Sequence, residues 1–344
     1  MMRFSIALAC LGTVADVVPL LGENRIITHH GLRFLREQES AGLKALKTSA
    51  CGLDSALRAH DIAFRLGPRL NAAGRLGDPG RALELLLTDD PARAADLALE
   101  LDKENDRRRR IEEGIISQAR AAAVEARRGD TPCIVLANPE WHAGVIGIAA
   151  ARIAEEFARP TVLIALEGDS GRGSGRTAGG VALHEVIEAA RSLLDDFGGH
   201  AEACGLRIKA AHVAPFAERL GAIIRARYPV LRETFTADAV MPPDSLTPAI
   251  IAECAGLAPF GEDNRPPVFI AERLATVGEV QRMGRTRSHL AFFVRSGRAA
   301  FRTVYFGGTA DADRIAGPLT FAYEPRLNTF NGAGEIELNL KRIL

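Results

Sequence analysis

The stretch 91–128 constrains the fold of this chain more than any other part of its sequence. Asp90 is a residue type that caps helices, and Pro91 suits a first helical turn. Apolar residues recur only at intervals, and between them runs 102–110, which is polar on every side. A helix with such a centre often bridges domains through solvent. We therefore predict one continuous connecting helix, which at ~1.5 Å per residue would be roughly 57 Å long.

The composition allows two or three ordinary globular domains. The chain has 344 residues, of which 47% are hydrophobic and 25% charged. Basic and acidic residues number 43 each, so only local clustering of charge can argue for nucleic acid. The five cysteines are scattered and form no C-x-x-C pair, which argues against a structural zinc site. Their odd number fits a reduced, cytoplasmic protein.

The N-terminus contains a short apolar run after Arg3. A secretory signal peptide is one interpretation, but the run is at the short end of the ~7–15 apolar residues that such a signal needs. We favour a buried strand over Leu8–Val14, apolar because both of its faces are covered. No other run approaches the ~18 apolar residues of a membrane span, so no membrane partner is expected.

The rest of the chain divides into regions of different pattern. Helices are expected at 31–37, 41–49, 79–87, 145–156 and 181–196, and strands at 133–137 and 161–166. This alternation predicts an α/β domain with a covered sheet. Short β-type runs follow at 268–270, 290–294, 301–306, 319–323 and 335–340. Strands this closely spaced suit a small β-barrel such as an OB-fold. The predicted domains are 1–90, 91–130 (connector), 131–230 and 232–344.

Two strings in the first ninety residues carry candidate chemistry. The string Leu11–Leu20 places Asp16 just after the expected strand. A carboxylate there can hold a hard cation, although a lone Asp is more often a loop or capping residue. The string Gly67–Leu76 places Arg69, Asn71 and Arg75 among glycines. Guanidinium groups match phosphate oxygens, whereas the structural alternative is a helix turn with surface arginines.

A second group of strings lies in the expected α/β domain. Asn138–Gly147 joins a strand to a helix, where backbone N–H groups can meet an anion, and it includes His142 and the only tryptophan, Trp141. Gly171–Thr177 contains Ser174 and Arg176 and suits an anion-binding loop, although a flexible surface loop has the same composition.

The last of these strings is Phe197–Gly205. Its glycines, Gly198 and Gly199, allow close approach of a ligand, and His200 can donate a hydrogen bond to phosphate. For Trp141, in the Asn138–Gly147 string described above, two roles are open: its ring could stack on a base, or it could fill a hydrophobic core.

Together, these five strings resemble the RecJ family of the DHH phosphoesterase superfamily, over nearly all of residues 8–344. The resemblance implies a 5′→3′ single-stranded-DNA exonuclease of DNA repair and recombination, which hydrolyses phosphodiester bonds with metal-activated water. It implies that Asp16 is catalytic and binds Mn²⁺ or Mg²⁺. It also implies a set of residues that bind DNA phosphates: Arg69, Asn71, Arg75, His142, Ser174, Arg176, Gly198, Gly199 and His200. Cys204 departs mildly from the family pattern, which has a small residue there.

The same resemblance implies metal ligands that this sequence does not contain. The family's other metal ligands, including an Asp-His-His triplet, belong upstream of Asp16, and no such triplet occurs here. The His29–His30 pair follows Thr28 and is interpreted as a helix-start pair. We therefore expect a fragment, or a chain that works with a separate N-terminal segment. The alternative is an inactive module that binds single-stranded DNA; a small-nucleotide phosphodiesterase is disfavoured because it needs no OB-fold.

The final domain has a basic stretch of its own. From Gln281 to Ala310 there is no acidic residue, and aromatic residues interleave with arginines such as Arg282, Arg285 and Arg287. Basic grooves with stacking aromatics are how OB-folds bind single strands. The alternative is an aromatic barrel core with solvated arginines outside, and both can hold because strand residues alternate between faces. Across the whole chain, we expect Asp16 and Arg75 to face Ser174, Arg176 and His200 across one cleft.

Overall fold

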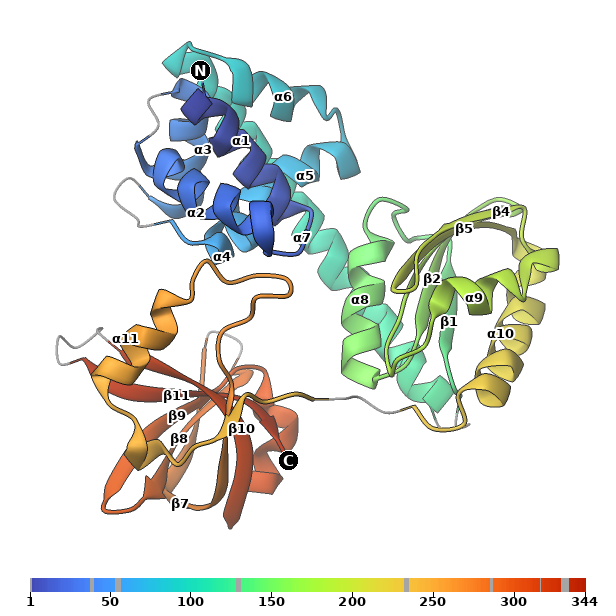
Figure 1. The fold of residues 1–344 in the computed structure, drawn as a ribbon. Coiled ribbons are helices and arrows are strands. Elements are labelled where there is room, and N and C mark those ends of the chain that lie inside the picture. Colours follow the sequence, from blue (N-terminus) through green and yellow to red (C-terminus); the bar gives the residue numbers. More distant parts are fainter. Residues whose placement is uncertain are drawn as a thin grey trace. The chain divides into compact units, whose positions relative to one another are not determined.

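The computed structural model describes residues 2–37, 40–52, 57–127, 131–231, 235–284, 287–315, 317–328 and 334–344. The chain forms two compact units. The first contains Met1–Glu37, Ala56–Ala63 and Phe235–Leu344, and the second contains Gln38–Ser55 and Phe64–Thr234. Helices and sheets both contribute, so the fold is mixed α/β, as predicted (Figure 1).

The first unit begins with two helices that pack on each other, α1 (Met2–Ala15) and α2 (Gly22–Glu37). The strand predicted over Leu8–Val14 is therefore wrong. A short apolar run fits a strand or a buried helix equally well, and the partner decides which forms. Here the partner is another helix, so close that a Cβ added to Gly31 would lie 2.2 Å from the Cβ of Cys10.

The pair His29–His30 lies in the middle of α2, so the prediction of a helix-start pair is also wrong. The helix begins seven residues earlier than the pair, at Gly22, and Thr28, which precedes the pair, is fully buried against the rest of the unit. The connection between α1 and α2 is held to the C-terminal part of the same unit. There the backbone N–H of Leu20 donates to the carbonyl oxygen of Glu262 over 2.8 Å.

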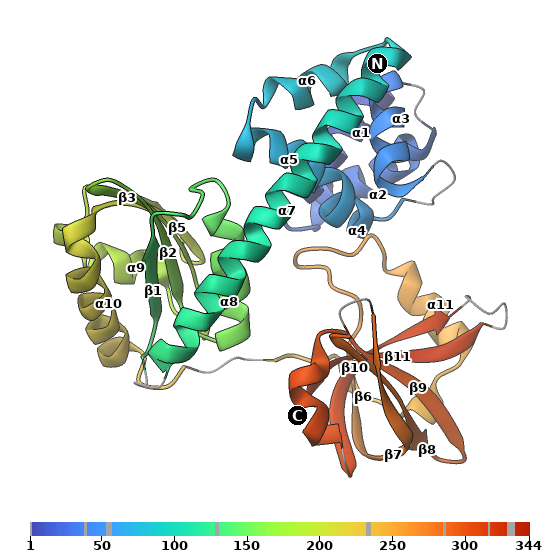
Figure 2. The same cartoon turned by 180° about the vertical axis from the view of Figure 1, so that it is seen from behind.

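The second unit begins with helices. Their bounds are α3 (Ala41–Cys51), α5 (Gly67–Leu76), α6 (Gly80–Leu87) and α7 (Pro91–Arg127). The short α4 (Ala59–Asp61) and a π-helical turn (Ile62–Leu66) precede α5. The helices predicted over 41–49 and 79–87 are confirmed. In both views α7 is one unbroken helix, against which α3, α5 and α6 pack (Figure 2).

The connecting helix α7 has the predicted start but not the predicted environment. The Oδ1 atom of Asp90 accepts from the backbone N–H of Ala92 over 2.9 Å, which is the expected cap. Its polar centre is not solvated on every side, because Asn105 is fully buried and Arg108 is 8% exposed. The prediction of an all-round solvated centre is therefore wrong: helix α5 covers one face of α7 there.

The α/β part of the second unit has one mixed sheet. Its strands are β1 (Ile134–Asn138), β2 (Thr161–Glu167), β3 (Ser170–Arg176), β4 (Asp196–Gly199) and β5 (Ala203–Lys209), in the order β1-β2-β3-β5-β4. Only β1 and β2 are parallel. The segment expected to be an anion-binding loop is therefore strand β3. Its glycines alternate with its other residues, which lets them face Leu206 and Ile164 in the core.

Helices cover both faces of this sheet (Figure 1). They are α8 (Ile146–Phe157), α9 (Leu183–Glu188) and α10 (Val213–Arg227). Along β2, Val162 and Ile164 join the core under α9 and α10, whereas Leu163 and Ala165 join the core under α7 and α8. The helix predicted over 181–196 ends early: α9 is followed by 3₁₀ turns at Arg191–Leu193 and Ala210–His212, with β4 and β5 between them.

The C-terminal part of the first unit is a closed barrel. Its strands are β7 (Phe269–Met283), β8 (His289–Ser296), β9 (Ala299–Tyr305), β10 (Pro318–Asn328) and β11 (Glu335–Ile343). Strand β10 pairs with both β11 and β7, which closes the ring, and β9 and β11 are parallel. Smaller elements accompany it: β6 (Ala239–Val240), α11 (Pro248–Gly256), and 3₁₀ turns at Pro243–Ser245 and Gly308–Ile315. All the predicted strand runs fall on these strands.

The barrel core is aromatic. Phe292, Phe321 and Tyr323 are at most 1% exposed. On β8, Phe292 and Val294 are buried while Phe293 and Arg295 face outward, as strand alternation requires. Within the described part of the chain, no helix is both long enough and apolar enough to cross a membrane.

Candidate nucleic-acid-binding site

The string Gly67–Leu76 forms helix α5, which presents Asn71 and Arg75 at its surface. Arg75 donates from Nη1 to the carbonyl oxygen of Gly144 over 3.1 Å. Arg69 is placed differently: its Nη2 pairs with Asp102 of α7 over 2.8 Å, and its side chain is only 11% exposed. Arg75 thus reaches the strand-to-helix junction before α8, whereas Arg69 is engaged in the α5–α7 interface.

The junction before α8 is a tight turn. Oδ1 of Asn138 accepts from the N–H of Glu140 over 2.8 Å, and Nδ1 of the exposed His142 accepts from the N–H of Gly144 over 3.1 Å. Gly144 needs to be glycine, since a Cβ there would lie 2.4 Å from the carbonyl oxygen of Arg75. Trp141 is buried and donates from Nε1 to Gln118 over 2.6 Å, so it fills a core and is not available to stack on a base.

Ser174 and Arg176 lie on β3, against the first turn of α8. The guanidinium of Arg176 donates to Oγ of Ser174 over 2.9 Å and to the carbonyl oxygen of Gly175 over 2.7 Å. A Cβ on Gly147 of α8 would lie 3.0 Å from both side chains. The N-terminal end of a helix favours anions because the aligned peptide dipoles place partial positive charge there. We call Arg75, Ser174, Arg176 and the start of α8 the anion cradle.

The electrostatics of the anion cradle favour an anionic ligand. Burial lowers the pKa of Arg176, and the positive charge of nearby Arg75 lowers that pKa further. Among the residues that the structure describes, neither guanidinium forms an ion pair with a carboxylate. Two like charges held together without a counterion are stabilised by an anion bound between them.

The string Phe197–Gly205 forms the β4–β5 hairpin, next to the anion cradle. Arg176 on β3 is directly opposite Ala203 on β5. The N–H of the exposed His200 donates to the carbonyl oxygen of Ala203 over 2.9 Å. Gly199 has φ +146° and no room for a Cβ, whereas Gly198 has open space around it. The hairpin therefore places the backbone of His200 near that of Arg176.

The thiol of Cys204 lies in the same corner. Its Sγ donates to the carbonyl oxygen of His200 over 3.4 Å. Burial raises the pKa of this thiol, and the charge of Arg176 acts in the opposite direction. The departure from the family pattern at this position is thus a buried, neutral side chain that fits under the turn.

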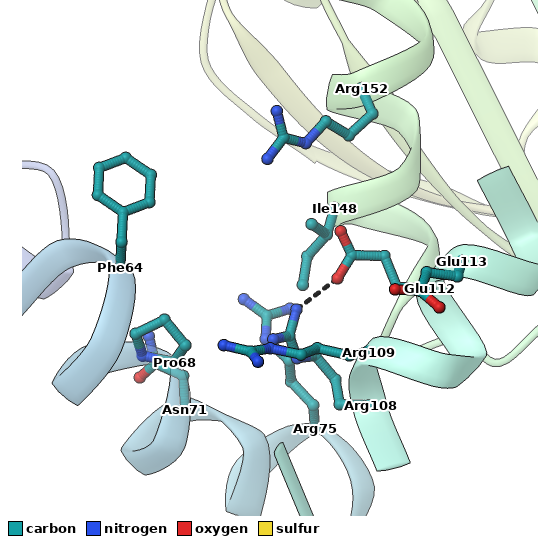
Figure 3. A pocket seen from close by; sticks show the side chains of 10 residues that line it. All are labelled: Phe64, Pro68, Asn71, Arg75, Arg108, Arg109, Glu112, Glu113, Ile148 and Arg152. Carbon is teal, nitrogen blue, oxygen red and sulfur yellow. Dashed lines mark hydrogen bonds and ion pairs between the residues drawn. The ribbon is translucent and has the colours of Figure 1, made fainter. Parts of the chain in front are cut away.

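A pocket of about 370 Å³ opens on α5, α7 and α8 of the second unit (Figure 3). Its lining residues are Phe64, Pro68, Asn71, Arg75, Arg108, Arg109, Glu112, Glu113, Ile148 and Arg152. We call it the arginine pocket. It shares Arg75 with the anion cradle. The sequence-based prediction missed Phe64, Arg108, Arg109 and Arg152; the arginine run 107–110 was visible, but was interpreted as a solvated helix centre.

Asp16 lies in the first unit, in the turn that ends α1, and its side chain is exposed. Across the described ranges of the chain, no group of three His, Cys, Asp or Glu side chains could hold a metal ion. A two-metal hydrolytic site needs several bridging ligands. The residues described here therefore do not fit such a site, and we derive no catalytic step through a metal.

The outer surface of the barrel carries the predicted basic stretch. Arg282, near the end of β7, and Arg287, after it, are both exposed, while Arg285 lies outside the described residues. Among the described residues of the barrel, the aromatic rings of Phe293 and Phe306 are also exposed, at 45% and 53%. Both features expected of a single-strand-binding surface are thus present beside a buried aromatic core.

Family models match both the α/β domain and the barrel of this chain. A family model described as the DHHA1 domain matches residues 130–226, and one described as the RecJ OB domain matches residues 237–342. The chain thus combines a DHHA1 domain with an OB domain of the kind found in one class of DNA exonuclease.

Whole-chain comparisons agree with this class. The single-stranded-DNA-specific exonuclease RecJ of Thermus thermophilus is 38% identical over 292 residues, which cover 85% of this chain and 41% of the relative. RecJ of Escherichia coli K12 is 37% identical over 273 residues, 76% of this chain and 47% of the relative. The crystal structure of Thermus thermophilus RecJ in complex with Mn²⁺ matches 99% of this chain and 50% of its own, with TM-score 0.86 and 33% identity. This chain belongs to the RecJ family, and spans less than half the length of these two curated relatives.

Proposed function

We propose that this chain binds single-stranded DNA and is part of a RecJ-type exonuclease that removes nucleotides from a 5′ end. The observation that carries the proposal is the anion cradle: Arg75 and Arg176 lie close together without a carboxylate partner among the described residues, at the start of α8. In the proposal, Arg75, Ser174, Arg176 and His200 hold a phosphate of the strand, with His142, Gly198 and Gly199 forming the turns around it.

Two further residues of the predicted set have supporting roles. Asn71 lines the arginine pocket beside Arg75 and can contact DNA directly. Arg69 is paired with Asp102, so we propose that its contribution is to fix α5 against α7. On the barrel, Arg282, Arg285 and Arg287 would neutralise phosphates farther along the strand, and the exposed rings of Phe293 and Phe306 would stack on bases.

The reaction of the whole protein is hydrolysis of a phosphodiester bond by metal-activated water. We propose Mn²⁺ or Mg²⁺ as the metal, because relatives of this chain have been solved in complex with each ion. Asp16 would supply one ligand, and the part of the protein that this chain does not span would supply the others. We further propose a role in DNA repair and recombination in the cytoplasm, which the five free cysteines support.

A binding experiment tests the proposal. Fluorescence anisotropy of a labelled single-stranded oligonucleotide should report binding that duplex DNA does not match. Arg176→Ala should weaken binding about tenfold, since a charged hydrogen bond contributes ~1.5–3 kcal/mol. Arg219→Ala, an equal loss of charge on the exposed side of α10, is the control and should change affinity little. Equal effects of the two variants would contradict the anion cradle.

A further inference from the structure

The arginine pocket has a charge and shape that the anion cradle does not explain. Four guanidinium groups line it, against the two carboxylates of Glu112 and Glu113. Arg108 is paired with Glu112, whereas the carboxylates that pair with Arg109 and Arg152 do not line the pocket, so the lining itself carries a net positive charge. Its volume of about 370 Å³ lies within the ~300–1,000 Å³ usual for ligand pockets.

One wall of the pocket contains a buried polar group, the guanidinium of Arg108. Arg108 lines the pocket, is 8% exposed, and donates from Nη2 to Oδ1 of Asn105 over 2.8 Å. Its Nε is buried and has no hydrogen-bond partner within the described structure. Burial lowers the pKa of Arg108, and the neighbouring charges of Arg109 and Arg75 act in the same direction. A buried donor without a partner costs ~1–3 kcal/mol, so this wall of the pocket is polar beneath its surface as well as on it.

The rest of the lining matches one nucleotide. Figure 3 shows the guanidinium groups of Arg75, Arg108 and Arg109 together, with the ring of Phe64 across the pocket from them. That ring is 60% exposed, and exposed aromatic rings are the groups on which bases stack. The carboxylate of Glu113 can accept from an exocyclic amino group of a base. Phosphate-binding, stacking and base-contacting groups thus lie in a single pocket.

We infer that the arginine pocket binds a second nucleotide, adjacent to the nucleotide whose phosphate lies in the anion cradle. Single-stranded DNA would then pass from the anion cradle to the arginine pocket at Arg75, which belongs to both. Arg109 and Arg152 bind the phosphate of this neighbouring nucleotide, and Phe64 stacks on its base. The ion pairs that Arg109 and Arg152 now make, with Asp106 over 3.9 Å and Glu155 over 3.8 Å, are long and exposed, so a phosphate can replace them. This inference rests on the proposed function.

The test compares two small competitors for a labelled single-stranded oligonucleotide bound to the chain: a 5′-mononucleotide and a 5′-phosphorylated dinucleotide. The dinucleotide should compete about tenfold better for the parent chain, because one stacked base contributes ~1–3 kcal/mol. The Arg109→Ala/Arg152→Ala variant should remove this advantage and leave competition by the mononucleotide unchanged. Phe64→Leu should reduce the competitive advantage of the dinucleotide over the mononucleotide. It should not change the salt dependence of oligonucleotide binding, because it removes no charge.

The matched control is Arg107→Ala/Arg110→Ala, which removes two exposed arginines from the same helix that do not line the pocket. The inference would be overturned if the dinucleotide still competed better in the pocket variant, or if the control variant lost that advantage equally. The proposed function would stand in either case if Arg176→Ala still weakens binding of single-stranded DNA. Equal losses for mononucleotide and dinucleotide in the pocket variant would mean that the pocket binds free nucleotide, which also overturns it. A parent chain that binds no single-stranded DNA would overturn the proposed function itself.

Discussion

Arg75 on α5 donates to the carbonyl oxygen of Gly144 over 3.1 Å, and the carbonyl oxygen of Arg75 lies 2.4 Å from where a Cβ on Gly144 would be. The helix that carries the arginines and the turn that begins α8 are therefore in contact through both side chain and backbone. This contact joins two strings that are separated in sequence, and sets where the guanidinium of Arg75 lies relative to Arg176.

Gly144→Ala should damage both stability and DNA binding. The new Cβ meets backbone, which cannot move aside cheaply, and overpacking of this kind costs ~1–3 kcal/mol. Urea denaturation should show that loss, and anisotropy should show weaker binding because Arg75 is displaced. The control is Gly114→Ala on α7, where a Cβ meets nothing within 4 Å. That change should stabilise the chain by about 0.5–1 kcal/mol, the helix preference of Ala over Gly.

The barrel arginines should contribute to affinity through phosphates alone. A variant with Arg282, Arg285 and Arg287 all changed to Ala should lower the slope of log affinity against log salt by about 0.7 per lost contact. The slope is measured by titration at several salt concentrations. Arg314→Ala is the control, because Arg314 pairs with Asp311 over 3.1 Å. A triple variant with the parent's slope and affinity would mean that these arginines are a solvated face.

The sequence predicted the elements whose pattern is set locally. The barrel strands, β1, β2, α8 and the whole of α7 follow from alternation, helical period and the cap at Asp90. The errors arose where a tertiary partner decides. Leu8–Val14 has the composition of a strand or a buried helix, and only its packing on α2 makes it helical. The glycines of β3 suggested a loop, yet they are needed because Ile164 and Leu206 fill the space beside them.

The site was predictable only in part, for the same reason. Arg75, Ser174, Arg176 and His200 were proposed from their glycine-rich strings, and the structure brings them into one region of the second unit, while their role in binding remains a prediction. Arg108 and Arg152 carry no such local signal, because their place in a pocket depends on how α7 and α8 pack. Whether Asp16 faces Arg75 remains a prediction, as do the bounds of the four predicted domains.

Metal-dependent hydrolysis should be absent from this chain alone. The residues described here supply one exposed carboxylate, Asp16, and no cluster of three metal-binding side chains. A labelled single strand incubated with Mn²⁺ should therefore stay intact, while full-length Thermus thermophilus RecJ degrades it. Asp16→Ala should leave DNA affinity unchanged. Robust 5′→3′ degradation by the chain alone would contradict this prediction.

The barrel should lose stability at alkaline pH through Tyr305. Burial, and then a hydrogen bond to Asp311 over 2.8 Å, raise the pKa of Tyr305 to about 12. Because the folded state favours the neutral phenol, this stabilisation is complete below the ordinary tyrosine pKa of about 10 and is lost as pH rises through about 12. Urea midpoints measured across this range should fall less steeply for Tyr305→Phe than for the parent. An unchanged slope would contradict the assignment.

The pair Arg108–Glu112 on α7 should contribute to the stability of the second unit only as a pair. Both side chains are at most 13% exposed, so removing one partner leaves a charge that water reaches poorly. Arg108→Met should therefore destabilise the chain by about 2 kcal/mol, somewhat less than the ~3–5 kcal/mol of a fully buried pair. Arg108→Met/Glu112→Met should recover most of that loss, since it removes both charges and keeps apolar volume. Free energies of unfolding for Arg108→Met, for Glu112→Met and for the double variant give the coupling energy between the two side chains. If the double variant is as unstable as the sum of the singles, the two side chains act independently, and Glu112 is then not the group that neutralises Arg108 in the wall of the arginine pocket.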